Sequence, residues 1–237
     1  MCDTAVILAG GLGTRLRPYT VVFPKPLMPL GEYPILEVVV RQLRYFGFRR
    51  LVFAVNHQAD LIKAYFSSGS RWDIRIEYSL ETRPLSTVGP LTLIPDLPEH
   101  FLLMNGDILT DLDFRLFCRQ HLEHGCAFTI SAARRSHQVE YGVLHMDERH
   151  RLTGFSEKPV SDYLVSMGIY AVNRSILSHV PGDTRYGFDN LMMDLLARNE
   201  QVRVCPFDGY WKDIGRQDDY IEAIDDFERD SVRFLRR

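Results

Sequence analysis

Cysteine is scarce in this chain, and its few cysteines do not form a paired motif. There are four, at Cys2, Cys118, Cys126 and Cys205, and no two of them are spaced as C-x-x-C. Disulfide frameworks and redox dithiols depend on such pairing, so we expect free thiols in a reducing cytoplasm. The cysteine pattern therefore disfavours a secreted, disulfide-rich protein.

Long apolar runs and a basic surplus are also lacking. The first residues, M-C-D-T-A-V-I-L, have neither the basic region nor the long apolar core of a secretory signal. No run approaches the ~20 apolar residues that span a bilayer. The net charge of −3 at pH 7 leaves no basic footprint for a nucleic-acid polymer. We expect a cytoplasmic protein with neither a membrane nor a nucleic-acid partner.

Glycine, in contrast, is concentrated in one short stretch near the start of the chain. Leu8–Pro18 reads L-A-G-G-L-G-T-R-L-R-P and follows the apolar run Ala5–Leu8. Glycines let the backbone curl with its N–H groups pointing inward, and such a concavity suits phosphate oxygens. Arg15 and Lys25 add positive charge beside it. The stretch predicts a phosphate-handling loop at the carboxyl end of the first strand.

Two common phosphate-binding fingerprints do not match this loop. A P-loop needs G-x-x-x-x-G-K-[ST], and no lysine follows Gly13. A dinucleotide fingerprint needs G-x-G-x-x-G, but Leu16 stands at the place of its third glycine. The second mismatch disfavours a dinucleotide-dependent oxidoreductase. The residues alone leave open a tight strand-to-helix turn or a different kind of phosphate site.

The rest of the chain alternates short apolar segments with helical patterns. Helices are expected at Pro34–Phe46, Gln58–Phe66, Phe114–His124, Tyr186–Asn199 and Gln217–Phe227. Strands are expected at Thr4–Ala9, Leu51–Val55, Ile74–Tyr78, Phe101–Met104, Phe128–Ala133, Tyr141–Met146, Leu164–Val172 and Val202–Cys205, with a turn at Gly209–Gly215. The pattern predicts one α/β domain, with a mostly parallel central sheet covered on both faces and a mixed or antiparallel extension in the second half.

Two aspartates stand out as candidate metal ligands. Asp107 closes the apolar strand Phe101–Met104 in the triplet N-G-D, and Asp213 lies in W-K-D-I-G. The carboxyl ends of strands face the ligand crevice of an open α/β sheet, and paired carboxylates there suit Mg²⁺. The triplets N-G-D and D-I-G also favour turns. On the residues alone, two unrelated aspartates in turns are therefore as good an interpretation as a pair of metal ligands.

Cys118, His121, His124 and Cys126 form a second set of metal-type side chains, with some of the spacing of a zinc site. An ordinary apolar stripe runs along the same predicted helix and includes Cys118 itself. We therefore expect a packed helix there, and not a structural zinc ion.

Six blocks of sequence, in order and spread over nearly the whole chain, resemble the signature of the sugar-1-phosphate nucleotidyltransferases, or NDP-sugar pyrophosphorylases. The blocks are Gly10–Pro18 with Pro24–Leu27, Pro84–Leu91, Asn105–Asp107, Tyr141–Val143, Glu157–Pro159 and Trp211–Gly215. The resemblance implies a Rossmann-like, three-layer α/β/α fold. It also implies one domain over residues 1–237, with a nucleotide-binding half at about 1–125 and a sugar-binding half at about 126–237.

The resemblance further implies an enzyme that transfers a nucleotidyl group from an NTP to a sugar 1-phosphate and releases pyrophosphate. The step is an Mg²⁺-assisted, in-line attack on the α-phosphorus. In such a transfer the protein mainly positions the reactants and neutralises their charge, and it contributes little covalent chemistry. The partners are then the NTP and the sugar 1-phosphate, while a homo-oligomer is left open.

Site residues follow from the matched blocks. The catalytic residues would be Arg15, Lys25 and Asp107, and the metal ligands Asp107 and Asp213. Residues near the nucleotide would be Leu8, Ala9, Gly10, Gly11, Gly13, Thr14, Arg15, Pro84, Leu85, Ser86, Thr87 and Gly89. Residues near the sugar phosphate would be Gly142, Glu157, Lys158 and Gly168.

Two departures from the family pattern concern the substrate. The family usually has L-G-T where this chain has Leu85-Ser86-Thr87, and Ser86 adds a hydroxyl near the expected base pocket. The family also commonly has N-A-G where this chain has Ser166-Met167-Gly168, which removes an expected hydrogen bond to the sugar. The reaction stays as implied, whereas the base and the sugar are left open.

Within the family, Glu140–Leu144 and Ser86–Leu91 most resemble members that transfer a guanylyl group from GTP to mannose- or heptose-type sugars. The sequence ends at Arg237, and its layout most resembles the short heptose-1-phosphate guanylyltransferases. The alternatives are uridylyl or thymidylyl transfer to a hexose or amino-sugar 1-phosphate, or a non-catalytic relative that senses an NDP-sugar. The presence of Arg15, Lys25 and both aspartates favours a working enzyme.

Overall fold

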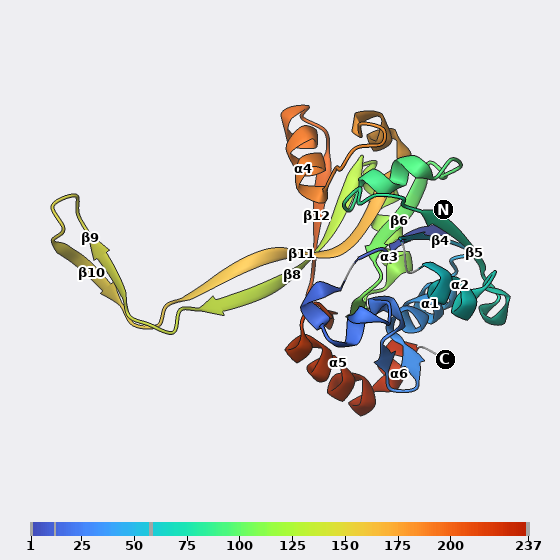
Figure 1. The fold of residues 1–237 in the computed structure, drawn as a ribbon. Helices are drawn as coiled ribbons and strands as arrows, with labels where there is room; N and C mark the ends of the chain where they lie inside the picture. The colour runs from blue at the N-terminus through green and yellow to red at the C-terminus, as the bar shows by residue number, and fades with distance from the viewer. Residues whose placement is uncertain (1, 12, 57–58, 236–237) are drawn as a thin grey trace.

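The computed structural model describes residues 2–11, 13–56 and 59–235, and within them one large sheet organises the molecule (Figure 1). Its spatial order is β12 (Val202–Phe207), β8 (Phe128–Gln138), β11 (Val160–Asn173), β6 (His100–Asn105), β1 (Thr4–Leu8), β4 (Arg50–Val55) and β5 (Arg75–Leu80). Strand β11 is antiparallel to both of its neighbours, and the other pairings in this sheet are parallel. The expected mostly parallel sheet with a mixed extension is confirmed.

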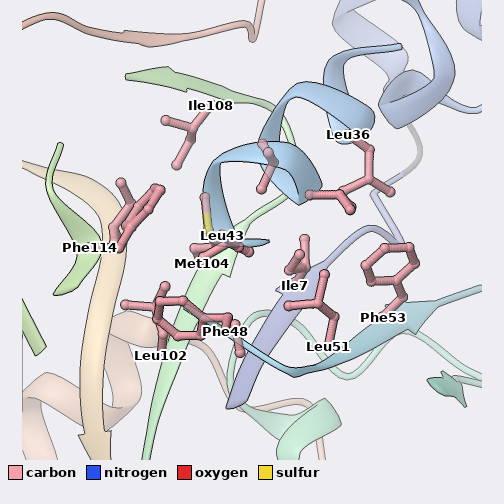
Figure 2. Packing of buried hydrophobic residues seen from close by; sticks show 14 of the residues in the cluster. Ile7, Leu36, Leu43, Phe48, Leu51, Phe53, Leu102, Met104, Ile108 and Phe114 are labelled. Carbon is pink, nitrogen blue, oxygen red and sulfur yellow. The ribbon is translucent and has the colours of Figure 1, made fainter. Parts of the chain in front are cut away.

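The central strands are apolar on both sides because both faces of the sheet are covered. Successive side chains of a strand point to opposite faces, so Ile7 and Val6 of β1 enter different clusters. Ile7 packs with Phe53 and Met104 on one face, as Figure 2 shows. Burial on two faces explains why these strands read as unbroken apolar runs.

Helices cover both faces of the sheet and complete three layers. Residues of α1 (Ile35–Tyr45), α2 (Ala59–Phe66) and α3 (Phe114–His124) pack on the face of Ile7, whereas residues of α4 (Phe188–Ala197) pack on the face of Val6. Helices α5 (Gln217–Arg229) and α6 (Ser231–Leu235) pack against residues of α1 in a third cluster. None of the described helices combines the length and apolarity that crossing a membrane requires.

Helix α3 shows why the expected helix boundaries hold. The Asp113 side chain accepts a hydrogen bond from the Leu116 N–H at 2.8 Å, and the helix ends at Gly125 in a left-handed conformation. The expected helix at Phe114–His124 is confirmed at both ends. Helix α2 was expected to start at Gln58, which lies outside the described residues, as does Leu12 of the glycine loop.

Short elements fill the remaining connections. They are the 3₁₀ helices η1 (Thr14–Leu16), η2 (Tyr19–Val21), η3 (Lys25–Leu27), η4 (Ser70–Trp72), η5 (Gly89–Leu93) and η6 (Arg174–His179), and the paired strands β2 (Pro29–Leu30) and β3 (Tyr33–Pro34). One expectation is corrected: within the predicted turn Gly209–Gly215, β13 (Trp211–Asp213) pairs with β7 (Ile108–Thr110). Strand β7 lies about 100 residues before β13 in the chain. The local sequence around β13 therefore does not reveal this pairing.

Strands β8 and β11 run on beyond the sheet as a long two-stranded ribbon. A hairpin of β9 (Val143–Met146) and β10 (Leu152–Ser156) follows at its far end. Residues 134–164, which we call the arm, project away from the rest of the molecule (Figure 1). The expected strands Phe128–Ala133 and Leu164–Val172 are therefore too short. The outer residues of both strands are exposed and mix polar side chains with the apolar Val160, Tyr163 and Leu164, because neither face of the ribbon is covered.

Candidate functional site

One pocket, with a volume of about 430 Å³, opens where the central strands end. Residues following β1, β4, β5 and β6 line it together with two residues of η3: Leu8, Ala9, Gly10, Gly11, Lys25, Pro26, Asn56, Glu81, Thr82, Arg83, Pro84, Ser86, Thr87, Asn105, Gly106 and Asp107. This is the crevice that open α/β sheets offer to ligands at the carboxyl ends of their strands.

The glycine loop forms one wall of this pocket. Gly13 has a φ of 60°, and a Cβ added there would lie 2.9 Å from Cγ2 of Thr20, so only glycine fits without a shift. The Thr20 hydroxyl donates to the Gly13 carbonyl at 2.6 Å, and the Asn56 side-chain amide donates to the Gly10 carbonyl. An added Cβ at Gly11 would meet nothing within 4 Å, so the backbone there is open to a ligand.

The four charged residues expected at the reacting centre come together beside the pocket. Lys25 is only 7% exposed, and its ammonium contacts the Asp107 carboxylate. The Ile214 N–H donates to the Asp107 carbonyl at 3.0 Å, as part of the β7–β13 pairing that brings Asp213 to the same place.

Arg15 completes this charged cluster. A Cβ added at Gly215 would lie 3.3 Å both from Nη2 of Arg15 and from Oδ2 of Asp213, so the two side chains flank one glycine. Strand β13, which sequence reasoning missed, therefore aligns one of the expected metal ligands. Gly13 and Thr14, which were expected near the nucleotide, are not among the residues that line the pocket.

Burial raises the pKa of Asp213, and the neighbouring Asp107 carboxylate raises it further, while Lys25 and Arg15 act in the opposite direction. The Asp107 and Asp213 carboxylates repel each other. A divalent cation bound between them would relieve that repulsion. Within the described residues, no group of three histidine, cysteine or acidic side chains could hold a metal. Two carboxylates without a full protein cage fit Mg²⁺, which keeps several waters and binds substrate phosphates.

The loop Pro84–Gly89 forms the opposite wall. Pro84, Ser86 and Thr87 line the pocket, whereas Leu85 and Gly89 are buried in the packing behind it. A Cβ added at Gly89 would lie 2.8 Å from the Thr184 carbonyl oxygen, so the glycine permits a close backbone approach.

Hydrogen bonds anchor this loop to the segment before α4. The Thr87 hydroxyl accepts from the Phe188 N–H at 2.8 Å, and the Tyr186 N–H donates to the Leu85 carbonyl at 3.0 Å. Ser86 adopts a φ of 69°, a left-handed conformation that suits the glycine usual in the resembling family.

Sequence reasoning missed Glu81 and Asn56 as pocket residues. One carboxylate oxygen of Glu81 accepts from the Leu85 N–H at 3.1 Å, and a Cβ added at Gly10 would lie 3.0 Å from the other. Burial raises the pKa of Glu81, and the Leu85 N–H opposes this. The signal was available, because Asn56 and Glu81 directly follow β4 and β5, and strand ends face the crevice.

The residues expected near the sugar phosphate lie in two separate places. Gly168, with a φ of 71°, lies against the pocket residue Asn105, since a Cβ added there would be 2.6 Å from its Nδ2. Gly142, Glu157 and Lys158 lie instead on the arm, where a Cβ added at Gly142 would be 3.2 Å from Oε2 of Glu157.

These three arm residues are held near one another but away from the pocket. The Val139 N–H donates to the Pro159 carbonyl at 3.0 Å, which closes the ribbon beside them. Beyond the pair Ala133–Val165, the β8–β11 register runs on to Gln138–Val160. At ~3.3 Å per residue this carries the bend of the arm well clear of the sheet (Figure 1).

His121, considered above as a zinc ligand, has protein partners at both ring nitrogens. Its Nε2 lies 3.1 Å from Nδ1 of His100, and its Nδ1 lies 2.8 Å from the Thr129 hydroxyl. Burial lowers the pKa of His121 to about 4, with a further contribution from the charge of His100. His121 thus links helix α3 to His100 of β6 and to Thr129 of β8 in a polar contact.

Known sequences similar to this chain include mannose-1-phosphate guanyltransferases and a UTP–glucose-1-phosphate uridylyltransferase. The family model described as nucleotidyl transferase matches residues 4–230. A mannose-1-phosphate guanyltransferase of Emericella nidulans is 31% identical over 226 residues, covering 92% of this chain and 62% of that protein. A UTP–glucose-1-phosphate uridylyltransferase of Synechocystis sp. is 31% identical over 240 residues, covering 93% of this chain and 62% of that protein.

Solved structures with the same fold include HddC from Yersinia pseudotuberculosis. It aligns with a TM-score of 0.74 at 26% identity, covering 95% of this chain and 99% of that one. The same protein complexed with GMP-PN aligns with a TM-score of 0.74 at 25% identity, with the same coverage. The chain thus matches nearly all of one solved structure, but spans 62% of the length of the curated relatives given above.

Proposed function

Because the chain belongs to the nucleotidyl transferase family, we propose that it transfers a nucleotidyl group from an NTP to a sugar 1-phosphate. One observation carries this proposal: Arg15, Lys25, Asp107 and Asp213 meet beside a pocket at the carboxyl ends of the parallel strands. A turn or a structural ion pair does not need two cations and two carboxylates gathered around a glycine-rich loop. Phosphoryl-type transfer does need such a set.

In the proposed reaction, a phosphate oxygen of the sugar 1-phosphate attacks the α-phosphorus of the NTP. The new bond joins that oxygen to the α-phosphorus, the bond from the α-phosphorus to the bridging oxygen breaks, and pyrophosphate leaves with the electron pair. Arg15 neutralises the triphosphate and the leaving pyrophosphate, because a guanidinium fork matches phosphate oxygens at two points. Lys25 contributes fixed charge near the reacting centre.

Asp107 and Asp213 are the residues that would hold Mg²⁺, as their pairing without a full protein cage suggests. When bound there, the ion would supply positive charge to the triphosphate. The protein's own part is to hold both carboxylates in place through the β7–β13 ladder, and to keep Lys25 against Asp107.

Glu81 supports GTP as the nucleotide. Guanine presents two adjacent donors, N1–H and the N2 amino group, and a carboxylate can accept from both. Uracil and thymine present a single N3–H between two carbonyl oxygens, which a carboxylate repels. Similarity to a mannose-1-phosphate guanyltransferase and to a structure complexed with GMP-PN points the same way.

We assign a mannose- or manno-heptose-type sugar 1-phosphate as the acceptor, bound by the half of the chain from about residue 126 onward. Residues 1–125 would form the nucleotide-binding half, which agrees with a pocket lined only by residues up to Asp107 among those described. A second candidate is uridylyl transfer to a hexose 1-phosphate, because the Synechocystis uridylyltransferase is as similar as the guanyltransferase.

A pyrophosphate-release assay with Mg²⁺ tests the proposal. It combines each of the four NTPs with the 1-phosphates of mannose, glucose, N-acetylglucosamine and manno-heptose. We expect release to be fastest with GTP and a manno-configured sugar. Fastest release with UTP would support the second candidate. Tight nucleotide binding without release from any pair would overturn the enzyme proposal in favour of a sensor of NDP-sugars.

A further inference from the structure

The hairpin at the end of the arm has one face made entirely of apolar side chains. In the β9–β10 register, Leu144 pairs with Phe155 and Met146 pairs with Leu152, and a β-bulge between Leu152 and Gly154 shifts the register so that both pairs lie on one face. Directly opposite residues share a face, so these four side chains form one surface. They are 59–67% exposed, while the neighbouring His145 pairs with Gly154 on the other face.

The whole arm exposes more apolar surface than a monomer usually tolerates. Its large apolar side chains that are at least 48% exposed are Tyr141, Leu144, Met146, Leu152, Phe155, Val160, Tyr163 and Leu164. Together they present on the order of 900 Å² of side-chain surface over the two faces of the arm, and a stable protein interface buries about 800 Å² on each partner. Two-stranded ribbons are also only marginally stable alone in water, so this surface calls for a cover.

A second exposed apolar surface lies in the segment that joins the glycine loop to Lys25. Tyr19, Val21, Val22 and Phe23 are 48–76% exposed, and we call them the lip of the site. The lip lies in the chain between Gly13 and Lys25, and its buried Thr20 holds the glycine loop by the hydrogen bond described above. A segment that covered the lip would therefore stand next to the phosphate pocket.

The arm is directed away from its own pocket by contacts at its base. The Arg135 guanidinium lies 4.8 Å from the ring centre of Trp211, and its Nη2 donates to the Trp211 carbonyl at 3.3 Å. Trp211 belongs to β13, whose last residue is Asp213. These contacts anchor the base of the arm beside β13, and the arm projects from there away from the rest of the molecule (Figure 1).

We propose that the arm crosses to a second copy of this chain, so that each arm packs its apolar hairpin on the partner's lip. Two-fold symmetry makes the exchange reciprocal, because the arm of each copy then contacts the lip of the other copy. The partner's lip then buries the apolar face of the hairpin. The bend of the arm brings the Lys158 ammonium and the Glu157 carboxylate to the sugar side of the partner's pocket. This inference rests on the proposed function only for the role of these two residues.

Sedimentation velocity tests the exchange without any assay of activity. Leu144→Arg places a charge in the apolar face, whereas His145→Arg places the same charge one residue away on the opposite face. The wild type and His145→Arg are expected to be dimers, and Leu144→Arg a monomer with unchanged far-ultraviolet circular dichroism. A monomeric wild type, or a Leu144→Arg variant that stays dimeric, would overturn the proposal.

Complementation tests whether the arm serves the partner's site. Asp107→Ala disables the pocket, and Lys158→Asn disables the arm; asparagine is chosen because Lys158 has a φ of 41°, which asparagine tolerates. If Asp107→Ala does not fold, Arg15→Ala takes its place. Each variant alone should lose most activity, while a heterodimer purified through two different tags should regain about half of the wild-type activity.

The heterodimer regains activity because it contains one intact pocket served by one intact arm. Activity no higher than that of the two homodimers, or full activity of Lys158→Asn alone, would contradict the exchange. If the wild type were inactive with every pair of substrates, the proposed function would fail while sedimentation still decided the exchange.

Discussion

Lys25 is the site residue whose surroundings the structure defines most sharply. It is buried between two prolines, and its ammonium faces two carboxylates. Prolines stiffen the backbone on both sides, so the ammonium is aimed with little freedom. Because this charge is fixed and poorly accessible to water, we expect it to act on bound phosphates more strongly than a surface lysine would.

We predict that Lys25→Ala lowers kcat/KM for pyrophosphate release by roughly 10²–10³-fold, the loss typical of one preorganised electrostatic contact. Lys25→Arg should not restore it, because the longer planar group does not fit the buried position. Lys63→Ala, on helix α2, serves as the control and should leave kcat/KM unchanged. Near-normal turnover of Lys25→Ala would remove this lysine from the reacting centre.

Glu81 is the residue on which the proposed preference for GTP depends. Glu81→Gln keeps the size of the side chain but replaces one acceptor by a donor. We predict a drop in kcat/KM with GTP of roughly 10–100-fold, as expected for a lost charge-assisted hydrogen bond, and a smaller change with UTP. Competition assays with both nucleotides measure the ratio. The exposed Glu99→Gln should leave that ratio as in the wild type, and an unchanged ratio in Glu81→Gln would show that the base is read elsewhere.

His121 makes folding depend on pH. Its pKa in the folded protein is about 4, against an ordinary value of 6.5. Above pH 6.5 the imidazole is neutral in both states. As the pH falls from 6.5 to 4 the unfolded chain binds a proton that the folded protein excludes. The free energy of unfolding should therefore fall over this window, by up to ~3 kcal/mol.

Urea unfolding at several pH values measures this slope. His121→Gln should lose most of it, whatever its own stability, because no group at that position then titrates. His150→Gln, at an exposed position on the arm, should retain it. An equal slope in wild type and His121→Gln would mean that other groups carry the pH dependence.

At the scale of elements, the loop after β5 combines a backbone constraint with a place in the pocket. Ser86 has a φ of 69°, which a β-branched residue adopts only with strain. Ser86→Val should lower the free energy of unfolding by ~1–2 kcal/mol, whereas Ser86→Gly should not lower it. Urea unfolding of both variants decides this, and equal stability of all three proteins would contradict the strain.

Elements with local signals were predictable from the sequence. The apolar runs of β1, β4 and β6 and the capped helix α3 follow from burial on two faces and from Asp113 and Gly125. Strand β13 was predicted as a turn because its ladder partner, β7, is distant in the chain. The outer halves of β8 and β11 were missed because an uncovered ribbon lacks an apolar face pattern.

At the scale of the whole molecule, the reacting centre was more predictable than its surroundings. Arg15, Lys25, Asp107 and Asp213 come from motifs that follow strands or turns, and the strand-end rule of α/β sheets brings such residues together. No local rule gives the direction in which a ribbon leaves a sheet. The sequence therefore predicted Gly142, Glu157 and Lys158 as residues near the sugar phosphate without indicating that they lie on an arm.

The central claim is transfer of a nucleotidyl group, and the fate of a phosphorus label tests it most directly. The protein, Mg²⁺ and mannose or manno-heptose 1-phosphate are incubated with GTP labelled either at the α- or at the γ-phosphorus. We predict that the α-label appears in an NDP-sugar and the γ-label in pyrophosphate. A γ-label transferred to the sugar phosphate, or an α-label found only in GTP and GMP, would contradict it.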